Sequence, residues 1–120
     1  SSISQIALAI PWITPTEATP DYYHSCCDNL AADVPTNWGG YQQPLTGQAY
    51  AGCYFRGLND YREYLQVELA TPMEPGICYQ VGFFINTMDQ WCGANQAGVF
   101  ISAQAPSLMG QTVAEVLAKM

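Results

Sequence analysis

Hydrophobic and polar residues alternate along several short stretches of the chain, a pattern typical of half-buried β-strands. In the clearest of these, residues 77–86, an apolar side chain fills every second position. The pattern predicts strands over 4–10, 49–55, 61–70, 77–86 and 98–103. Within 77–86, the face that we expect in the core consists of Ile77, Tyr79, Val81, Phe83 and Ile85.

Two regions depart from this alternation. Residues 11–47 carry five prolines and a Gly-Gly pair but few periodic apolar residues, which predicts a long loop region. From Thr112 the period changes, because Thr112 and Glu115 have capping-box spacing and apolar residues recur at helical intervals. We therefore expect an all-β protein, an antiparallel β-sandwich or jelly roll, with a short C-terminal helix.

The balance of charges excludes two classes of partner. Only 11% of the residues are charged and the net charge is −7, with Arg56, Arg62 and Lys119 as the only basic side chains. Nucleic acid is not an expected partner, because its binding needs clustered basic residues that neutralise phosphates. Membrane insertion is not expected either, because no apolar run reaches the length of a span.

Cysteine usage indicates an oxidising compartment, because five cysteines are many for a short cytosolic chain. The odd number means that one thiol is free, bonded to another chain, or separated from a partner in a longer protein, and we favour the last. Neighbouring Cys26 and Cys27 point in different directions on an extended backbone, which favours different partners for them. The candidates for disulfide bonds are Cys26, Cys27, Cys53, Cys78 and Cys92.

Four motifs occur in a characteristic order: TPDYYHSC at 19–26, VPTNWGGYQ at 34–42, TGQAYAG at 46–52 and YREYLQ at 61–66. In this order they resemble the jelly-roll, galactose-binding-like N-terminal module of secreted surface proteins from gliding, polysaccharide-degrading Gram-negative bacteria. The similarity spans about residues 3–106. It implies an extracellular or cell-surface location and, as partners, the other domains of a larger surface protein.

Modules of this family begin with an Asn-x-Ser-Phe-Glu strand and a Cys-Pro, and they end with strands that carry a Trp and a Gly-rich glutamate motif. Neither end is present here. The resemblance therefore implies that residues 1–106 are a jelly-roll module lacking its first and last strands, with 107–120 as a separate C-terminal tail. It also offers the missing upstream cysteine as a partner for Cys26.

Carbohydrate recognition needs flat aromatic faces beside amides, carboxylates and guanidinium groups that bind hydroxyls. Such side chains gather in the loop region and around the hairpin that follows it. The candidate ligand-binding residues are Trp38, Tyr41, Gln42, Tyr54, Arg56, Asn59, Asp60, Tyr61 and Arg62. The alternative interpretation is that the aromatic residues are buried anchors and that Arg62 forms a structural ion pair.

The spacing of acidic residues disfavours catalysis. A glycosidase needs two carboxyl groups facing one cleft, yet Glu63 and Glu68 lie on opposite faces of a regular strand. Asp60 or Asp89 could pair with one of them, but no spacing requires it. Glu63 falls on the apolar side of its strand, which indicates a bulge, a strand end or a buried, paired carboxylate.

No pattern of histidines and cysteines has zinc-site spacing, because His24, Cys26 and Cys27 lack the usual paired arrangement. A structural calcium ion at Asp60 and Asp89 is the one metal that the loops could hold, and no other cofactor is expected. We therefore expect a non-catalytic extracellular module that binds a glycan or polysaccharide, or serves adhesion. The alternative is a structural or protein-interaction spacer, in which the aromatic residues would be buried without an exposed groove.

Overall fold

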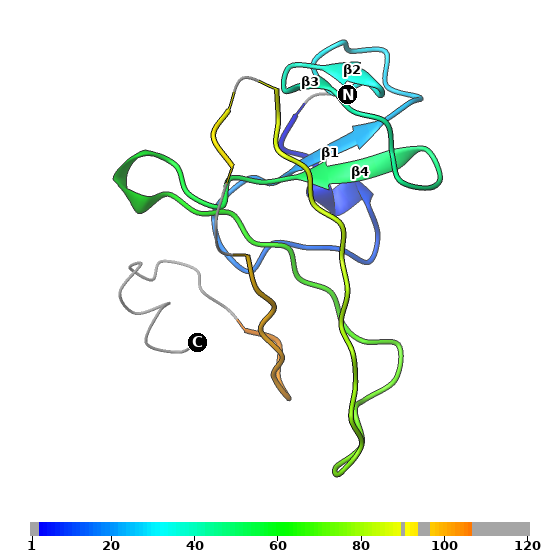
Figure 1. The fold of residues 1–120 in the computed structure, drawn as a ribbon, viewed down its shortest axis with the longest axis vertical. Helices are drawn as coiled ribbons and strands as arrows, with labels where there is room; N and C mark the ends of the chain where they lie inside the picture. Colours follow the sequence, from blue (N-terminus) through cyan, green and yellow to red (C-terminus); the bar gives the residue numbers. More distant parts are fainter. Residues whose placement is uncertain (1–2, 90, 94–96, 107–120) are drawn as a thin grey trace.

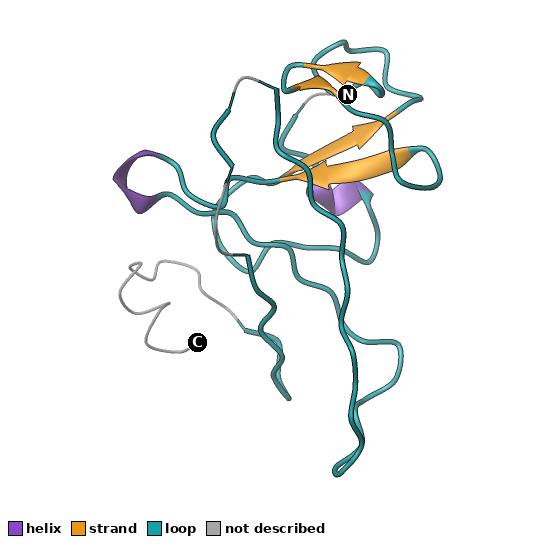
Figure 2. Ribbon diagram, in the orientation of Figure 1, coloured by secondary structure: helices purple, strands orange, loops and turns teal. Residues whose placement is uncertain are grey.

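The computed structural model describes residues 3–89, 91–93 and 97–106. Within these ranges the protein consists of short strands, 3-10 helices and long extended connections, without an α-helix (Figures 1 and 2). In chain order the elements are η1 (Ile6–Leu8), β1 (Asp21–His24), β2 (Thr36–Asn37), β3 (Gly40–Tyr41), β4 (Ala49–Gly52) and η2 (Leu58–Asp60). The strands form two antiparallel sheets of two strands each. The prediction of a β-rich protein is confirmed at this level.

In the described part of the chain, no helix has the length and hydropathy that a membrane span requires.

The first sheet pairs β1 with β4 and lies in the upper part of the molecule, next to the β2–β3 hairpin (Figure 1). Its register sets Tyr23 opposite Tyr50 and Asp21 opposite Gly52. The rings of Tyr23 and Tyr50 lie 5.1 Å apart between centroids, which is a favourable cross-strand aromatic pair. A Cβ atom on Gly52 would lie 2.7 Å from Cε2 of Tyr23, so the absence of a side chain at Gly52 lets this ring lie against β4.

The second sheet is the hairpin of β2 and β3, whose two-residue turn consists of Trp38 and Gly39. The side chain of Asn37 stabilises this turn: its Oδ1 accepts the N–H of Gly39 at 3.0 Å and its Nδ2 donates to the Asp33 carbonyl at 3.0 Å. The same Nδ2 also donates to the hydroxyl of Tyr50. Asn37 therefore connects the hairpin with β4 and fixes the position of Trp38.

The prediction of a loop over residues 11–47 is wrong in part, because β1, β2 and β3 all lie inside it. β1 is only four residues long, and its partner β4 begins well beyond the hairpin. A strand this short shows too little alternation to be detected by its period, and its pairing with a distant segment leaves no local signal.

The buried core gathers around β1 and the segment that follows it. Its members are Tyr23, Cys27, Ala32 and Val34, with Tyr50 and Met88 packed against them. The core predicted from the alternation of residues 77–86 is wrong, because all five side chains of that face are 48–57% exposed. Alternation specifies which side chains share a face but not which segment covers that face. No described segment pairs with residues 77–86 in a β-sheet.

Three other predicted strands also differ from the structure. Residues 4–10 form η1 and turns, because Ser4 takes a left-handed φ of 66° and breaks the extended run. Residues 61–70 contribute a single antiparallel bridge, from Gln66 to Ile13. Residues 98–103 carry no assigned strand. The predicted strand 49–55 is confirmed over its first half, as β4.

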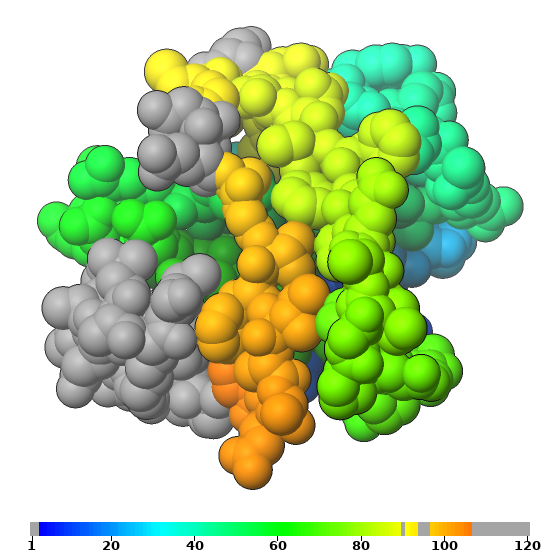
Figure 3. Space-filling model, turned by 60° about the horizontal axis from the view of Figure 1, so that its bottom comes forward, coloured from blue at the N-terminus to red at the C-terminus, as the bar shows by residue number. Residues whose placement is uncertain are grey.

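The extended segments lie on one face of the molecule. In Figure 3 residues 97–106 in orange and the segment around 72–86 in yellow-green form two neighbouring ridges. Both ridges are rich in exposed apolar side chains, which belong to Ile77, Tyr79, Val81, Phe83, Phe84, Ile85, Val99, Phe100 and Ile101. The predicted C-terminal helix from Thr112 and the tail 107–120 lie outside the described residues.

Candidate functional site

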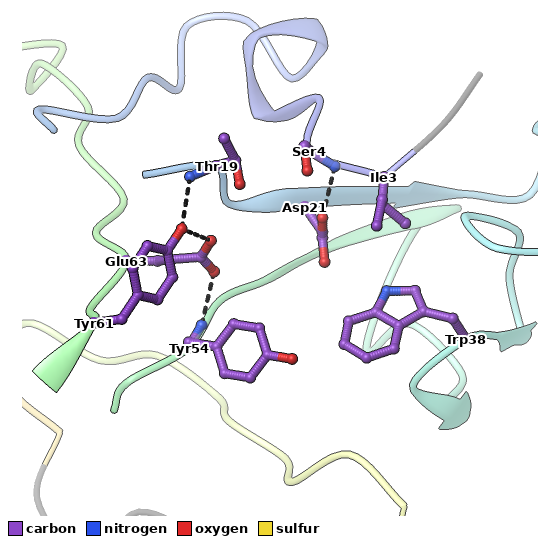
Figure 4. A pocket seen from close by; sticks show the side chains of 8 residues that line it. All are labelled: Ile3, Ser4, Thr19, Asp21, Trp38, Tyr54, Tyr61 and Glu63. Carbon is purple, nitrogen blue, oxygen red and sulfur yellow. Dashed lines mark hydrogen bonds between the residues drawn. The ribbon is translucent and has the colours of Figure 1, made fainter. Parts of the chain in front are cut away.

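A pocket of about 300 Å³ opens beside the first sheet (Figure 4). It is lined by Ile3, Ser4, Thr19, Asp21, Trp38, Tyr54, Tyr61 and Glu63. Three of these, Trp38, Tyr54 and Tyr61, are residues for which the sequence predicted ligand binding. The volume lies at the lower end of the range of about 300–1,000 Å³ that is usual for small-molecule sites, which suits a group the size of one sugar ring.

Separate parts of the fold position the three aromatic side chains. Trp38 projects from the β2–β3 turn, while Tyr54 and Tyr61 lie on the two arms that lead into and out of η2. These arms are joined by a hydrogen bond of 2.8 Å from the N–H of Glu63 to the carbonyl of Tyr54. The pocket is therefore formed by segments that are distant in sequence and that the first sheet brings together.

The rings meet at steep angles and do not stack. Tyr54 lies edge-to-face with Tyr61 and with Trp91, at 72° and 75°, and Trp38 makes 86° with Trp91. The centroids of Trp38 and Tyr54 are 6.4 Å apart. Trp38, Tyr61 and Trp91 are 36%, 42% and 52% exposed, so the cluster is open to solvent. The prediction of buried aromatic anchors without an exposed groove therefore does not fit this cluster.

Glu63 is one of two acidic residues that line the pocket, and it is only 6% exposed. Its Oε2 accepts the N–H of Tyr54 at 2.8 Å and its Oε1 accepts the hydroxyl of Tyr61 at 3.0 Å (Figure 4). The hydroxyl of Tyr61 in turn accepts the N–H of Thr19 at 3.3 Å. The structure thus confirms a buried carboxylate at Glu63, and hydrogen bonds satisfy it where an ionic partner was expected.

Asp21 is the second acidic residue of the pocket and is also 6% exposed. Its Oδ1 accepts the N–H of Ser4 at 2.6 Å and its Oδ2 accepts the hydroxyl of Tyr23 at 2.9 Å. Figure 4 shows its carboxylate on β1 between the side chains of Tyr54 and Trp38. Asp21 and Glu63 form a carboxylate pair around one pocket, which the sequence argument about Glu63 did not consider.

Negative charge dominates the pocket. Burial, followed by the charges of Glu63 and Asp21, raises the pKa of the Cys53 thiol to about 11. The same causes in the same order raise the pKa of the Tyr54 hydroxyl. Desolvation and then the hydrogen bond to Asp21 raise the pKa of Tyr23. These three groups are therefore neutral at physiological pH, and the two carboxylates supply the local charge.

The arginines of the described residues lie elsewhere. Nε of Arg56 is 2.9 Å from Oδ1 of Asp60, and Nη2 of Arg62 is 3.9 Å from the same oxygen. Neither arginine lines the pocket. This network of exposed and half-buried charges sits at η2, where Asn59 and Asp60 take left-handed φ values of 55° and 57°. Arg62 thus forms the structural ion pair that the sequence offered as an alternative.

The remaining predicted ligand residues lie outside the pocket as well. Tyr41 is on β3, and its N–H donates to Oδ2 of Asp89 at 2.9 Å. The amide oxygen of Gln42 accepts a hydrogen bond from Asn86. The structure therefore divides the predicted ligand-binding residues into two groups. Trp38, Tyr54 and Tyr61 line the pocket together. The residues that lie outside it are Tyr41, Gln42, Arg56, Asn59, Asp60 and Arg62.

The two predicted calcium ligands are also engaged separately, Asp60 by arginines and Asp89 by the backbone of Tyr41. Among residues 3–89, 91–93 and 97–106, no group of three or more His, Cys, Asp or Glu side chains could hold a metal ion. Nδ1 of His24 accepts the N–H of Cys26, which makes it part of a local turn.

All five cysteines are free thiols in this structure; Cys27 is buried, Cys53 half-buried, and Cys26, Cys78 and Cys92 are exposed. Disulfide pairing among them stays a prediction.

Sequence reasoning missed Asp21 and Trp91. Asp21 starts a strand that was interpreted as loop, so its placement opposite Gly52 left no local signal. Trp91 follows a turn and reaches the cluster through tertiary packing against Tyr54. One clue was available for Glu63, because an acidic residue on an apolar face indicates a buried, satisfied carboxylate.

Comparisons with protein-family models, with curated proteins and with solved structures found no match to this chain.

Proposed function

We propose that this chain is a non-catalytic extracellular module of a bacterial surface protein that binds carbohydrate or serves adhesion. We propose also that its fold is a galactose-binding-like jelly roll. The resemblance of its four motifs supports the fold, the location and the source. The observation that carries the function is the pocket in which exposed Trp38 and Tyr61 and partly buried Tyr54 lie beside the carboxylates of Asp21 and Glu63.

The chemistry of the pocket suits a sugar. Aromatic faces bind the apolar C–H face of a pyranose ring, and carboxylate oxygens accept hydrogen bonds from its hydroxyl groups. Each carboxylate oxygen of Asp21 and Glu63 accepts one internal hydrogen bond and keeps further lone-pair capacity. The low content of charged residues also supports an uncharged or weakly charged ligand over nucleic acid.

The internal hydrogen bonds support binding without catalysis. A catalytic pair needs one carboxyl group that is protonated and free to donate to the leaving oxygen. Here Tyr61 and the backbone of Tyr54 both donate to Glu63, and Ser4 and Tyr23 both donate to Asp21. Every oxygen of the two carboxyl groups thus accepts a hydrogen bond from within the protein.

A glycan array with the purified chain tests the proposal, with Trp38→Ala and Trp12→Ala as a matched pair of variants. Trp38 and Trp12 are similarly exposed, at 36% and 41%, but only Trp38 lines the pocket. We expect binding to at least one polysaccharide, a loss of about tenfold or more in Trp38→Ala, and wild-type binding in Trp12→Ala. Absence of binding to every glycan, or release of reducing ends from a bound one, would overturn the proposal.

One observation favours the second candidate, a structural spacer that packs against other domains of a larger protein. The apolar side chains of residues 77–85 and 99–101 are 46–82% exposed on neighbouring ridges (Figure 3). Exposed apolar surface of this extent is typical of protein–protein contacts. Replacing Phe83 and Phe84 together with Ser tests it: a spacer loses association with its neighbouring domain in a co-purification experiment, and unchanged association counts against this candidate.

A further inference from the structure

The pocket combines two features that a neutral sugar does not need. Two buried carboxylates line it, and no arginine of the described residues reaches it. Among the described residues, hydrogen bonds hold both carboxylates, and neither arginine lines the pocket. Buried charges of this kind are costly, and a positively charged group of a ligand would compensate them.

The aromatic geometry points in the same direction. A flat platform of exposed rings is the usual surface for stacking a neutral pyranose, whereas the rings that line this pocket are tilted, Trp38 to Tyr54 by 36° and Tyr54 to Tyr61 by 72°. Rings at such angles present π faces and edges from several directions around one space. Electron-rich faces arranged in this way attract ammonium groups, and Trp is the strongest of them.

The pKa values of Cys53 and Tyr54 are raised in part by the same two carboxylates. Both groups shift upward first through burial and then through the charges of Glu63 and Asp21. Negative charge on these carboxylates would favour the protonated form of an amine placed in the pocket.

We propose that the pocket selects glycans that carry a protonated amine, with the ammonium group lying against the faces of Trp38 and Tyr54 and facing the carboxylates of Asp21 and Glu63. This inference rests on the proposed function and names its ligand class, an amino sugar with a free 2-amino group. A neutral or N-acetylated sugar of the same ring geometry binds less tightly, because it leaves the two carboxylates without a cation.

The test compares three trimers of β-1,4-linked sugars that differ at one substituent. These are a glucosamine trimer with free amines, the same trimer fully N-acetylated, and cellotriose, which carries hydroxyl groups at the same positions. Isothermal titration calorimetry uses the whole chain at a mildly acidic pH, where the amines are protonated. We expect the glucosamine trimer to bind about tenfold or more tightly than the other two, the size of effect usual for a desolvated cation at an aromatic site.

A matched pair of variants separates the pocket from the overall negative charge of the protein. Glu63→Gln and Glu68→Gln each remove one negative charge, but Glu63 lines the pocket and Glu68 is exposed outside it. We expect Glu63→Gln to lower the preference for the amine about tenfold and Glu68→Gln to leave it unchanged. Circular dichroism of both variants checks their folding, and the comparison of ligands on the wild-type chain needs no variant.

The outcomes distinguish the two proposals. Equal binding of all three trimers, or equal loss in both variants, overturns the selection of amines and leaves glycan binding intact. Failure of all three trimers and of every glycan on the array overturns both. Preferential binding of the glucosamine trimer that Glu63→Gln abolishes and Glu68→Gln does not supports both.

Discussion

The close packing of Tyr23 against Gly52 makes a sharp prediction about the sheet that supports the pocket. A methyl group added at Gly52 would lie 2.7 Å from Cε2 of Tyr23, well inside van der Waals contact. The ring cannot move away easily, because Tyr23 is fully buried, donates to Asp21 and packs on Tyr50. Gly52→Ala is therefore expected to strain the β1–β4 pair.

The magnitude follows from two opposing terms. Overpacking costs about 1–3 kcal/mol, and the lost flexibility of the unfolded chain returns about 0.4–1 kcal/mol. The net loss is about 1–2 kcal/mol. With an unfolding entropy of about 2.1 cal/mol/K per residue over the chain, this corresponds to a fall in Tm of about 4–8 °C.

Thermal unfolding followed by circular dichroism measures this change, and Gly82→Ala is the matched control. A Cβ at Gly82 would meet nothing within 4 Å, so the same substitution there should leave Tm unchanged or raise it slightly. Equal Tm values for the two variants would refute the reasoning, because the steric contact with Tyr23 is the feature that separates them.

Other polar and titratable groups give four more predictions. Glu63→Ala should lower the free energy of unfolding, measured by urea titration, by about 2–3 kcal/mol, because it removes the acceptor of two hydrogen bonds. Glu68 is exposed, so Glu68→Ala should change the free energy of unfolding by less than about 0.5 kcal/mol. Tyr23→Phe should cost about 1–3 kcal/mol in the same titration, because it deprives a buried carboxylate of its donor. Iodoacetamide should modify Cys53 more slowly than exposed Cys26 at neutral pH, as measured by mass spectrometry. Folding raises the pKa of the Cys53 thiol from 9.0 to about 11. The contribution of this thiol to the free energy of unfolding should therefore be full below pH 9 and lost by about pH 11. Cys53→Ser should abolish this part of the pH dependence of stability.

The sequence predicted the class of the fold and part of the site. Strand β4 was predicted because Ala49–Gly52 belongs to a longer run of strand-forming residues. The aromatic candidates Trp38, Tyr54 and Tyr61 were identified because turn-flanking aromatic residues are common in ligand sites, and all three line one pocket. The strand prediction rests on local composition, which a single sequence displays directly, and ligand binding by the three aromatic residues stays a prediction.

The failures have a common cause in long-range packing. The alternation of 77–86 describes a two-faced segment, yet the face is buried only if another segment covers it, and none of the described segments does. Asp21 belongs to the pocket because β1 pairs with distant β4. Tyr41 has the same side chain as the pocket residues Tyr54 and Tyr61, yet its backbone is held by Asp89, and Arg62 is held by Asp60. Composition therefore identifies candidates, and pairing decides which of them meet.

The two carboxylates of this site have different consequences for the stability of the fold and for the function of the pocket. Burial of two carboxylates costs desolvation free energy, which the hydrogen bonds that they accept offset in part. Some of the hydrogen-bond donors to these carboxylates also line the pocket: the hydroxyl of Tyr61 and the backbone of Tyr54 both donate to Glu63. The hydrogen bonds that stabilise the charges therefore also orient the aromatic side chains around the opening. Such coupling is typical of a site that is organised before its ligand arrives, since a bound cation would meet fixed carboxylates and fixed rings without further ordering of the chain.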